Sequence, residues 1–367
     1  MRRTIPVGLA LAFVVLAGAL TAPAAASSVT VVASGLDNPR GVAIGPNGAI
    51  YVAEAGRGGA GPCFGGPEGG QVCLGQSGAI TRLWRDEQMR IVVGLPSVAA
   101  PDGSSAIGPV DVGLLGTGQL YATIGLGADP AIRSAPGVPA FARQFGNLVR
   151  VNGARGTWTS VADVSAFEAA NNPDSADPGS HVDSNPYGLL VTPNGRIVAD
   201  AGGNDLLRVS ATGEVSLLSV FPARFVSSPF GTIPMQAVPT SVVVGPGGDY
   251  YVGQLTGFPF PVGGANIYRV PREGGSPTVF ASGFTNIIDI AFGGDGSLYV
   301  LEIAHNGLLS GDPTGALIRV RPNGTRETLP IAGLVMPGGF AIAADGSFYI
   351  TNFSVAAGAG QLIRFAP

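Results

Sequence analysis

The chain has 367 residues and a formal net charge of −4, and all 20 of its basic residues are arginine. The slightly acidic balance argues against nucleic-acid binding, and the absence of lysine excludes Schiff-base catalysis through a lysine side chain. Abundant glycine (58) and proline (30), only 12% charged residues and no amphipathic stretch of helical period are typical of an all-β protein with many turns.

The first 26 residues have the pattern of a secretory signal peptide. Arg2 and Arg3 precede an apolar run from Val7 to Leu20, and small residues suited to cleavage follow at Ala24–Ala26. A retained membrane anchor is the alternative, but the apolar run is shorter than the roughly 20 residues that a bilayer requires. We therefore expect the mature chain to be exported (extracellular or periplasmic), with no membrane span after cleavage.

One phrase recurs six times in the rest of the chain. Each copy has an apolar strand, a glycine-containing turn, a second strand, and then a third strand that carries an arginine. The copies begin at 38–54, 108–124, 185–200, 238–254, 286–302 and 336–352. A fourth strand follows each of the first five copies, and repeated four-stranded units are typical of the blades of a β-propeller.

The sixth copy lacks a fourth strand of its own. The segment VTVVASGL at 29–36 closely resembles the fourth strand PTVFASGF at 277–284. We therefore predict an all-β, six-bladed β-propeller over residues 27–367, in which Val29–Ala33 pairs beside Gln361–Phe365. This pairing closes the ring and removes two free sheet edges.

Insertions interrupt the first blades at 55–77, 125–145 and 165–184. All lie on connections that a propeller places on one face, where function tends to be carried by loops. The first insertion contains Cys63 and Cys73, which in an exported protein we expect to form a disulfide; half of a metal site is the alternative. FPFP at 258–261, with Phe230, Phe284 and Phe353, either forms an apolar rim or packs a long loop.

The last residue of each second strand is polar in five of the six copies. These positions are Glu54, Ile124, Asp200, Gln254, Glu302 and Asn352. Carboxylates that converge at a channel mouth must be paired, protonated or bound to a cation, and oxygen ligands suit Ca²⁺ or another divalent cation. We take Glu54, Asp200, Glu302 and Asn352 as candidate metal ligands; alternatively, each bonds backbone groups within its own blade.

Asp111 and Asp289 stand in a column of small residues on the innermost strands, on nearly opposite blades. They either line a water-filled channel or form part of a ligand site along the axis. The candidate ligand-binding residues are Arg40, Asp111, Asn185, Gln254 and Asp289.

Both histidines fall on the same predicted face. His181 lies two residues from Asp183, and His305 follows the second strand of the fifth copy. A histidine paired with a carboxylate can act as a general base, so His181, Asp183 and His305 are the candidate catalytic residues.

Three segments, at 183–209, 238–270 and 283–302, resemble the ScyD/ScyE family, exported propeller-like proteins named from the gene cluster for a cyanobacterial sunscreen pigment. The resemblance extends over essentially the whole mature chain. It implies a periplasmic or extracellular location and carries over no catalytic residues. At blade level the chain also resembles NHL-type repeats and gluconolactonase-like six-bladed propellers, a likeness that implies a divalent cation held by Glu, Asn and Asp at the channel mouth.

Three functions compete on this basis. The first is a secreted binding or scaffold protein of the ScyD/ScyE type, expected to be monomeric, which holds a small molecule or partner protein on the loop-rich face at the channel mouth. The alternative is a divalent-metal-assisted hydrolase or lactonase that uses the acidic ring. A quinone-dependent sugar dehydrogenase would need a set of His and Arg residues that two scattered histidines hardly supply.

Overall fold

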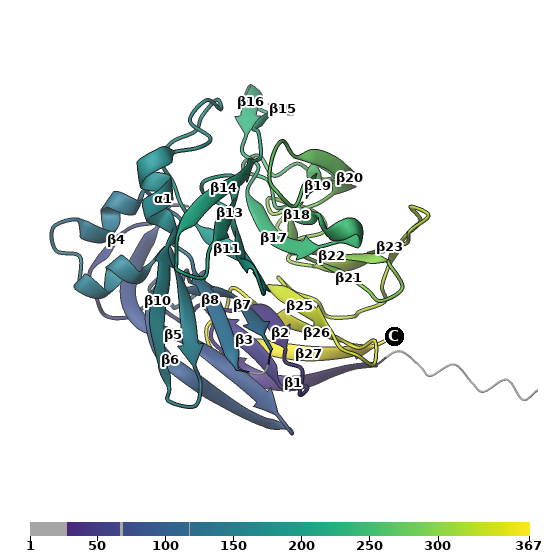
Figure 1. Cartoon of the computed structure of the whole chain (residues 1–367), viewed down its shortest axis with the longest axis horizontal. Helices are drawn as coiled ribbons and strands as arrows, with labels where there is room; N and C mark the ends of the chain where they lie inside the picture. The colour runs from purple at the N-terminus through teal and green to yellow at the C-terminus, as the bar shows by residue number, and fades with distance from the viewer. Residues whose placement is uncertain (1–27, 67–68, 117) are drawn as a thin grey trace, which may run out of the picture.

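The structure, a computed structural model, describes residues 28–66, 69–116 and 118–367. Six antiparallel sheets surround a central axis, which confirms the predicted all-β, six-bladed propeller (Figure 1). The innermost strands contact one another in the order β2, β7, β11, β17, β21 and β25, and β25 returns to β2. The predicted signal peptide lies outside the described residues.

Blade 1 contains the two longest strands of the propeller, β5 and β6. Blade 1 consists of β2 (Pro39–Ile44), β3 (Ile50–Glu54), β5 (Gln71–Trp84) and β6 (Glu87–Ala99), with the short β4 (Cys63–Gly65) added to β5. Blade 2 consists of β7 (Pro109–Leu115), β8 (Gln119–Ile124), β9 (Asn147–Asn152) and β10 (Thr157–Asp163). Blade 3 consists of β11 (Pro186–Thr192), β12 (Gly195–Asp200), β13 (Asp205–Val209) and β14 (Val215–Val220).

The last three blades are more regular. Blade 4 consists of β17 (Pro239–Val244), β18 (Tyr250–Gln254), β19 (Ala265–Val270) and β20 (Thr278–Phe284). Blade 5 consists of β21 (Ile287–Phe292), β22 (Leu298–Glu302), β23 (Ala316–Val320) and β24 (Arg326–Thr328). Blade 6 consists of β25 (Gly339–Ile342), β26 (Phe348–Asn352), β27 (Gly360–Ala366) and β1 (Ser28–Leu36).

The N-terminal strand closes the ring as the sequence predicts. β1 is antiparallel to β27, with Val29 opposite Phe365 and Ala33 opposite Leu362. The two strands lie side by side next to the C-terminus in Figure 1. The outer strand of blade 6 thus comes from the opposite end of the chain to its other three strands.

The hydrophobic core is divided among the junctions between neighbouring blades. Ile80 of blade 1 packs with Val149 of blade 2, for example, and Leu362 of blade 6 packs with Val52 of blade 1. Similar clusters join blades 2 and 3, 3 and 4, 4 and 5, and 5 and 6. Each blade is therefore buried on both faces, which explains why its inner strands are almost continuously apolar.

The insertions carry structure that the repeat pattern does not predict. The connection after β8 contains the 3-10 helices η1 (Pro130–Ser134) and η2 (Ala140–Gln144), and a third, η3 (Pro246–Gly248), lies in the β17–β18 turn. Helix α1 (Val164–Asn171) follows β10, and Asp163 caps it by accepting a hydrogen bond from Ala166 N. A hairpin of β15 (Arg224–Ser228) and β16 (Gly231–Met235) projects between blades 3 and 4.

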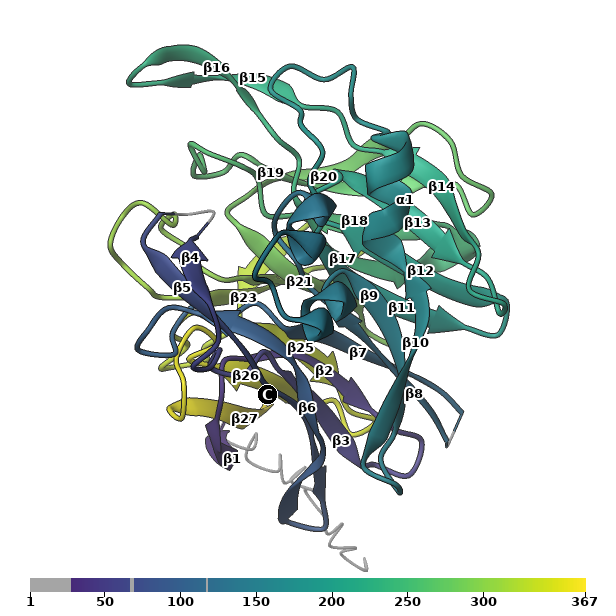
Figure 2. The ribbon, with the colours of Figure 1, turned by 90° about the vertical axis from the view of Figure 1, so that its left-hand side faces the viewer.

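Helix α1 and the β15–β16 hairpin lie at one end of the molecule in Figure 2, and the β5–β6 turn lies at the other. We call the end that carries α1, β4 and this hairpin the loop-rich face. Cys63 and Cys73 form the predicted disulfide on it. Within the described ranges, none of the helices has the length and apolar character needed to cross a membrane.

Candidate functional site

Asp111 and Asp289 lie beside the propeller axis on the innermost strands of opposite blades. Asp111 Oδ2 accepts a hydrogen bond from Leu189 N of blade 3, and Asp289 Oδ2 accepts one from Phe340 N of blade 6, each at 2.8 Å. Both side chains are half-buried. Burial raises the pKa of Asp289 to about 7 and, with help from the charge of Asp289, raises that of Asp111 well above its usual value. The channel therefore contains two acids that hold protons more strongly than free aspartates.

Tyr187 and Arg40 add a phenol and a guanidinium to this axial group. The Tyr187 hydroxyl is buried beside the Arg40 guanidinium. Burial is the main reason that the pKa of Tyr187 is raised; the nearby Arg40 charge opposes this shift, and Asp111 and Asp289 add to it. The Arg40 guanidinium donates to the Ala106 carbonyl at 2.8 Å. Sequence reasoning selected Arg40 and missed Tyr187, although both occupy the same position of the repeat, directly after a proline.

The predicted metal ligands at the ends of the second strands are nearly inaccessible. The exposed fractions of Glu54, Asp200, Glu302 and Asn352 are 0, 1, 1 and 2%. Each accepts a hydrogen bond from a backbone amide just before the innermost strand of its own blade. These bonds come from Asp37 N (2.7 Å), Asn185 N (2.5 Å), Thr285 N (2.6 Å) and Val335 N (2.7 Å), respectively. Each of the four side chains therefore connects the start of the innermost strand of its blade to the end of the second strand of the same blade.

No three His, Cys, Asp or Glu side chains in the described part of the chain are grouped so that they could hold a metal ion by themselves. Glu54 is further engaged by Thr81 and by the Arg90 guanidinium, whose Nη2 lies 2.6 Å from Glu54 Oε2. A cation shared by Glu54, Asp200, Glu302 and Asn352 stays a prediction, and the geometry gives it no support.

Two further candidate ligand residues also make bonds to the backbone. Gln254 Oε1 accepts from Asn266 N at 3.0 Å and from Arg224 Nη2 at 3.2 Å, whereas its Nε2 is buried without a partner. Asn185 Oδ1 accepts from Leu126 N of the preceding blade at 3.1 Å. Both amides thus help to fix the connections of the loop-rich face.

The two histidines form separate pairs with carboxylates on blades that are not neighbours. His181 Nε2 lies 3.8 Å from Asp183 Oδ2, and its side chain is 74% exposed. His305 Nδ1 bonds Glu302 Oε2, although its own side chain is 45% exposed. Burial raises the pKa of Asp183 to about 6 and also raises that of Glu302, where His305 opposes the shift. A catalytic role for His181, Asp183 or His305 stays a prediction.

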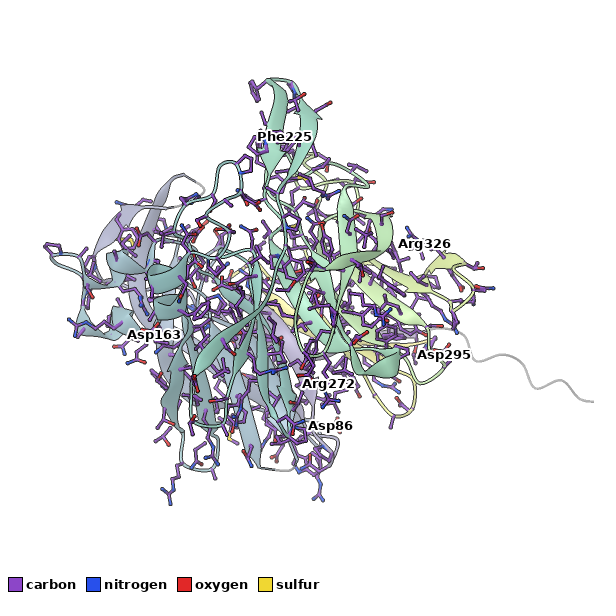
Figure 3. The ribbon with its side chains drawn as sticks, turned by 45° about the horizontal axis from the view of Figure 1, so that its top comes forward. Asp86, Asp163, Phe225, Arg272, Asp295 and Arg326 are labelled. Carbon is purple, nitrogen blue, oxygen red and sulfur yellow. A yellow bond between two sulfur atoms is a disulfide. The ribbon has the colours of Figure 1, made fainter. Side chains whose placement is uncertain are left out.

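Five large apolar side chains are exposed on the connections of blades 3, 4 and 5. We call them the apolar rim: Phe225 (64% exposed), Phe230 (80%), Phe258 (46%), Val262 (67%) and Leu309 (65%). The rings of Phe230 and Phe258 lie 6.5 Å apart, although one is on the hairpin and the other on the β18–β19 loop. Figure 3 shows Phe225 on the projecting hairpin, far from Asp86 in the β5–β6 turn.

The apolar rim differs in part from the rim that the sequence analysis considered, which consisted of residues 258–261 with Phe230, Phe284 and Phe353. Phe230 and Phe258 belong to it, but Phe284 is fully buried in the core between blades 4 and 5. Phe284 ends β20 opposite Ala265 of β19 and is the one fully buried residue of that strand. Phe225, Val262 and Leu309 carry no sequence signal, since single apolar residues in loops are ordinary.

No family model matches the chain, and no curated protein matches it. The ScyD/ScyE resemblance therefore stays a prediction.

Solved structures share the fold at low sequence identity. Virginiamycin B lyase from Staphylococcus aureus is 12% identical, with a TM-score of 0.51, over 93% of this chain and 99% of that one. The PQQ-bound aldose sugar dehydrogenase from Streptomyces coelicolor is also 12% identical, with a TM-score of 0.54, over 94% and 99%. These similarities establish the fold, a six-bladed propeller. At such low sequence identity a shared fold does not establish a shared function, which has to be argued from the residues of the site.

Proposed function

We propose that this protein is an exported binding or scaffold propeller of the ScyD/ScyE type, which holds a small molecule or partner protein on its loop-rich face. The apolar rim is the observation that carries this proposal. Phe230 and Phe258 come from different connections and still approach to 6.5 Å, so their exposed surfaces adjoin. Adjoining exposed apolar groups on a globular protein mark an interaction site.

The chemistry of the rim limits what it can bind. Its side chains are aromatic or aliphatic, and four of the five are at least 64% exposed, namely Phe225, Phe230, Val262 and Leu309. Burial of such groups against a partner is favourable by about 25 cal/mol for each Å² of apolar surface removed from water. The partner should therefore present aromatic or aliphatic groups to blades 3 to 5.

The alternative of a metal-assisted hydrolase or lactonase has weaker support. It requires Glu54, Asp200 and Glu302 to ligate a cation, but their oxygens already accept backbone amides. A cation there would have to displace those bonds and leave buried donors without acceptors, at about 1–3 kcal/mol each. The disulfide agrees with export under either function, because disulfides persist in oxidising compartments.

The rim can be tested with an environment-sensitive apolar dye, 8-anilinonaphthalene-1-sulfonate. We expect the double variant Phe230→Ser/Phe258→Ser to lose most of the dye fluorescence of the wild-type protein. Val93→Ser is the matched control, because Val93 is 59% exposed on β6 of blade 1, away from the rim. The proposal fails if the control loses as much dye binding as the double variant.

A photo-reactive benzoylphenylalanine at position 230 extends the test to natural partners. Adducts formed in the medium or periplasm of expressing cells should require position 230 and be absent with the same group at position 93. Equal labelling from both positions would show that the rim is not the binding surface.

A further inference from the structure

The arginine of the third strand recurs in all six blades, but its partners differ from blade to blade. In blades 4, 5 and 6 it forms an ion pair with an aspartate of the turn between the first two strands of the same blade. These pairs are Arg269 with Asp249, Arg319 with Asp295 and Arg364 with Asp345. In these blades the fold itself supplies a counter-charge for the arginine.

Arg319 of blade 5 shows how the pair is built. Its Nε donates to Ser297 Oγ at 3.1 Å, and its Nη2 donates to Asp295 Oδ2. Asp295 Oδ1 accepts a hydrogen bond from Ser297 N at 3.0 Å, which fixes the aspartate within the turn. A carboxylate and a hydroxyl, two residues apart, therefore hold the guanidinium.

Blade 1 keeps this turn but lacks both acceptors. Asn47 Oδ1 accepts from Ala49 N at 3.2 Å, the same turn hydrogen bond, so Asn47 and Ala49 occupy the positions of an aspartate and a serine. The amide carries no charge, and alanine has no hydroxyl. The equivalent arginine, Arg82, has a buried Nε without a hydrogen-bond partner. A buried donor of this kind is costly, which favours a ligand that supplies the acceptor.

A groove of about 540 Å³ lies beside Arg82, between blades 1 and 2. We call it the arginine groove and define it by five of the residues that line it: Tyr51, Arg82, Arg150, Arg155 and Trp158. Its described lining contains no acidic side chain, and none of the ion pairs among the described residues includes any of its three arginines. The positive charge of the groove is therefore not balanced by the fold.

The arginine groove is separate from the loop-rich face. Arg82 lies two residues before the end of β5, and Arg155 lies in the β9–β10 turn. The β5–β6 turn is at the opposite end of the molecule from α1 and the β15–β16 hairpin (Figure 2). A ligand in the groove would thus be independent of a partner on the apolar rim.

We propose that the arginine groove binds a small organic anion, a carboxylate carried on a flat aromatic body. A guanidinium matches a carboxylate because it can donate two parallel hydrogen bonds to it. Tyr51 and Trp158 are half-buried and provide aromatic surface against which a flat ring can stack. Arg150 and Arg155 are exposed, and their charge attracts anions to the groove. The volume of the groove is that of ordinary small-molecule sites.

The competing interpretation is that water alone satisfies Arg82, whose side chain is half-buried. It treats the loss of the two acceptors in blade 1 and the groove beside Arg82 as unrelated. The two interpretations differ in whether the protein holds a carboxylate more tightly than a neutral molecule of the same shape.

Calorimetric titration with naphthalene-2-carboxylate is the direct test, and the uncharged naphthalene-2-carboxamide is the control ligand. We expect one carboxylate per chain with a dissociation constant of about 1 mM or tighter, and binding of the amide that is weaker by about tenfold or more. Arg82→Gln should weaken carboxylate binding to the same extent. The matched control Arg319→Gln changes the equivalent arginine of blade 5, which is already paired with Asp295, and should leave binding unchanged. Equal binding of the two ligands, equal binding by Arg82→Gln, or no binding at all would overturn the site.

The two tryptophans of the chain, Trp84 and Trp158, show where the carboxylate binds. Trp158 lines the groove and Trp84 does not. We expect saturating naphthalene-2-carboxylate to shift the indole N–H resonance of Trp158, and Trp84→Phe distinguishes the two signals. Binding that leaves the Trp158 resonance unmoved would place the ligand elsewhere and contradict the proposal.

The double variant Asn47→Asp/Ala49→Ser tests the site even if Arg82→Gln does not fold. It recreates in blade 1 the two acceptors found beside Arg319, so Arg82 should pair within the turn and carboxylate binding should weaken by about tenfold or more. Asn323→Asp adds a negative charge to the exposed β23–β24 turn and should bind like the wild-type protein. Unchanged binding by the double variant would show that Arg82 does not hold the anion.

Discussion

Asp111 and Asp289 each carry a hydrogen bond from one blade to the next, at equivalent positions on opposite sides of the axis. Asp111 accepts from Leu189 N and Asp289 from Phe340 N, both at 2.8 Å. Other junctions use a hydroxyl and a carbonyl instead, as in Thr240 Oγ1 to Ile287 O at 2.8 Å. The junctions between blades 2 and 3 and between blades 5 and 6 therefore include a hydrogen bond to a carboxyl group that titrates, whereas the bond between Thr240 and Ile287 joins groups that do not titrate.

This difference predicts a pH-dependent contribution to stability from Asp289. The pKa of Asp289 in the folded protein is about 7, above the roughly 3.9 of an unfolded aspartate. Because the folded state holds the proton more strongly, the stabilisation is complete below about pH 4 and is lost as the pH rises through 7. We expect the melting temperature to fall over that window and Asp289→Asn to flatten part of the fall.

Asp289→Asn also changes a hydrogen bond. The pH dependence of the melting temperature must therefore be interpreted separately from its absolute value. Asp289 accepts from Phe340 N and from Ile290 N, each with a different oxygen. The single oxygen of an asparagine amide can replace only one of them, and the loss should cost about 1–3 kcal/mol at every pH. Asp86→Asn, in the exposed β5–β6 turn, is the control for a change of net charge. A parallel displacement of the whole pH profile by Asp289→Asn would show that Asp289 keeps an ordinary pKa.

The strand-end carboxylates predict a stability effect that is independent of metal. Glu302→Ala removes the acceptor for Thr285 N and the partner of His305, so we expect a loss of about 1–3 kcal/mol from the unfolding free energy. Glu302→Gln keeps an acceptor and should recover most of this loss. Denaturant unfolding with and without EDTA is the measurement, and a loss seen only without EDTA would instead restore the metal prediction for this residue.

The fold could be predicted from the sequence because the strand pattern of one blade recurs six times along the chain. The inner strands, the closing pair β1 and β27, and the disulfide all follow from a repeat or from a short spacing. Helix α1 has only eight residues, too few for a periodic signal, and its cap at Asp163 is a single residue. The helix was therefore not predictable from the sequence.

The candidate site was only partly predictable, for a physical reason. The repeat shows which residues share a position, as with Glu54 and Glu302, but not whether a carboxylate turns toward a neighbour or toward its own backbone. Two buried acids, Glu168 of α1 and Asp205 of β13, lie close enough for their charges to interact, through an insertion that has no counterpart in other blades. Alignment of repeats cannot find such a group, because only the three-dimensional fold brings its members together.

Ring closure predicts a large effect of removing the N-terminal strand. Without residues 28–36, β27 has a free edge and Leu36 leaves the core between blades 6 and 1. We expect a chain that starts at residue 37 to melt far below one that starts at residue 28, or to fail to accumulate as a monomer. Thermal melting and light scattering of the two chains provide the comparison, and equal melting temperatures would mean that the strand is dispensable.

The disulfide predicts a local effect, because it joins β4 to a strand already fixed by the rest of blade 1. Cys73 pairs with Ala99 of β6 in the same sheet, whereas β4 is held by β5 alone. We expect the double variant Cys63→Ser/Cys73→Ser to lose no more than about 3 kcal/mol of unfolding free energy, the chain-entropy value for so short a ring. Hydrogen exchange should accelerate at Gly61 and Leu74, whose amides bond each other's segments, and remain unchanged in blades 3 to 5. Faster exchange throughout the propeller would show instead that the loop over 55–77 supports the ring as a whole.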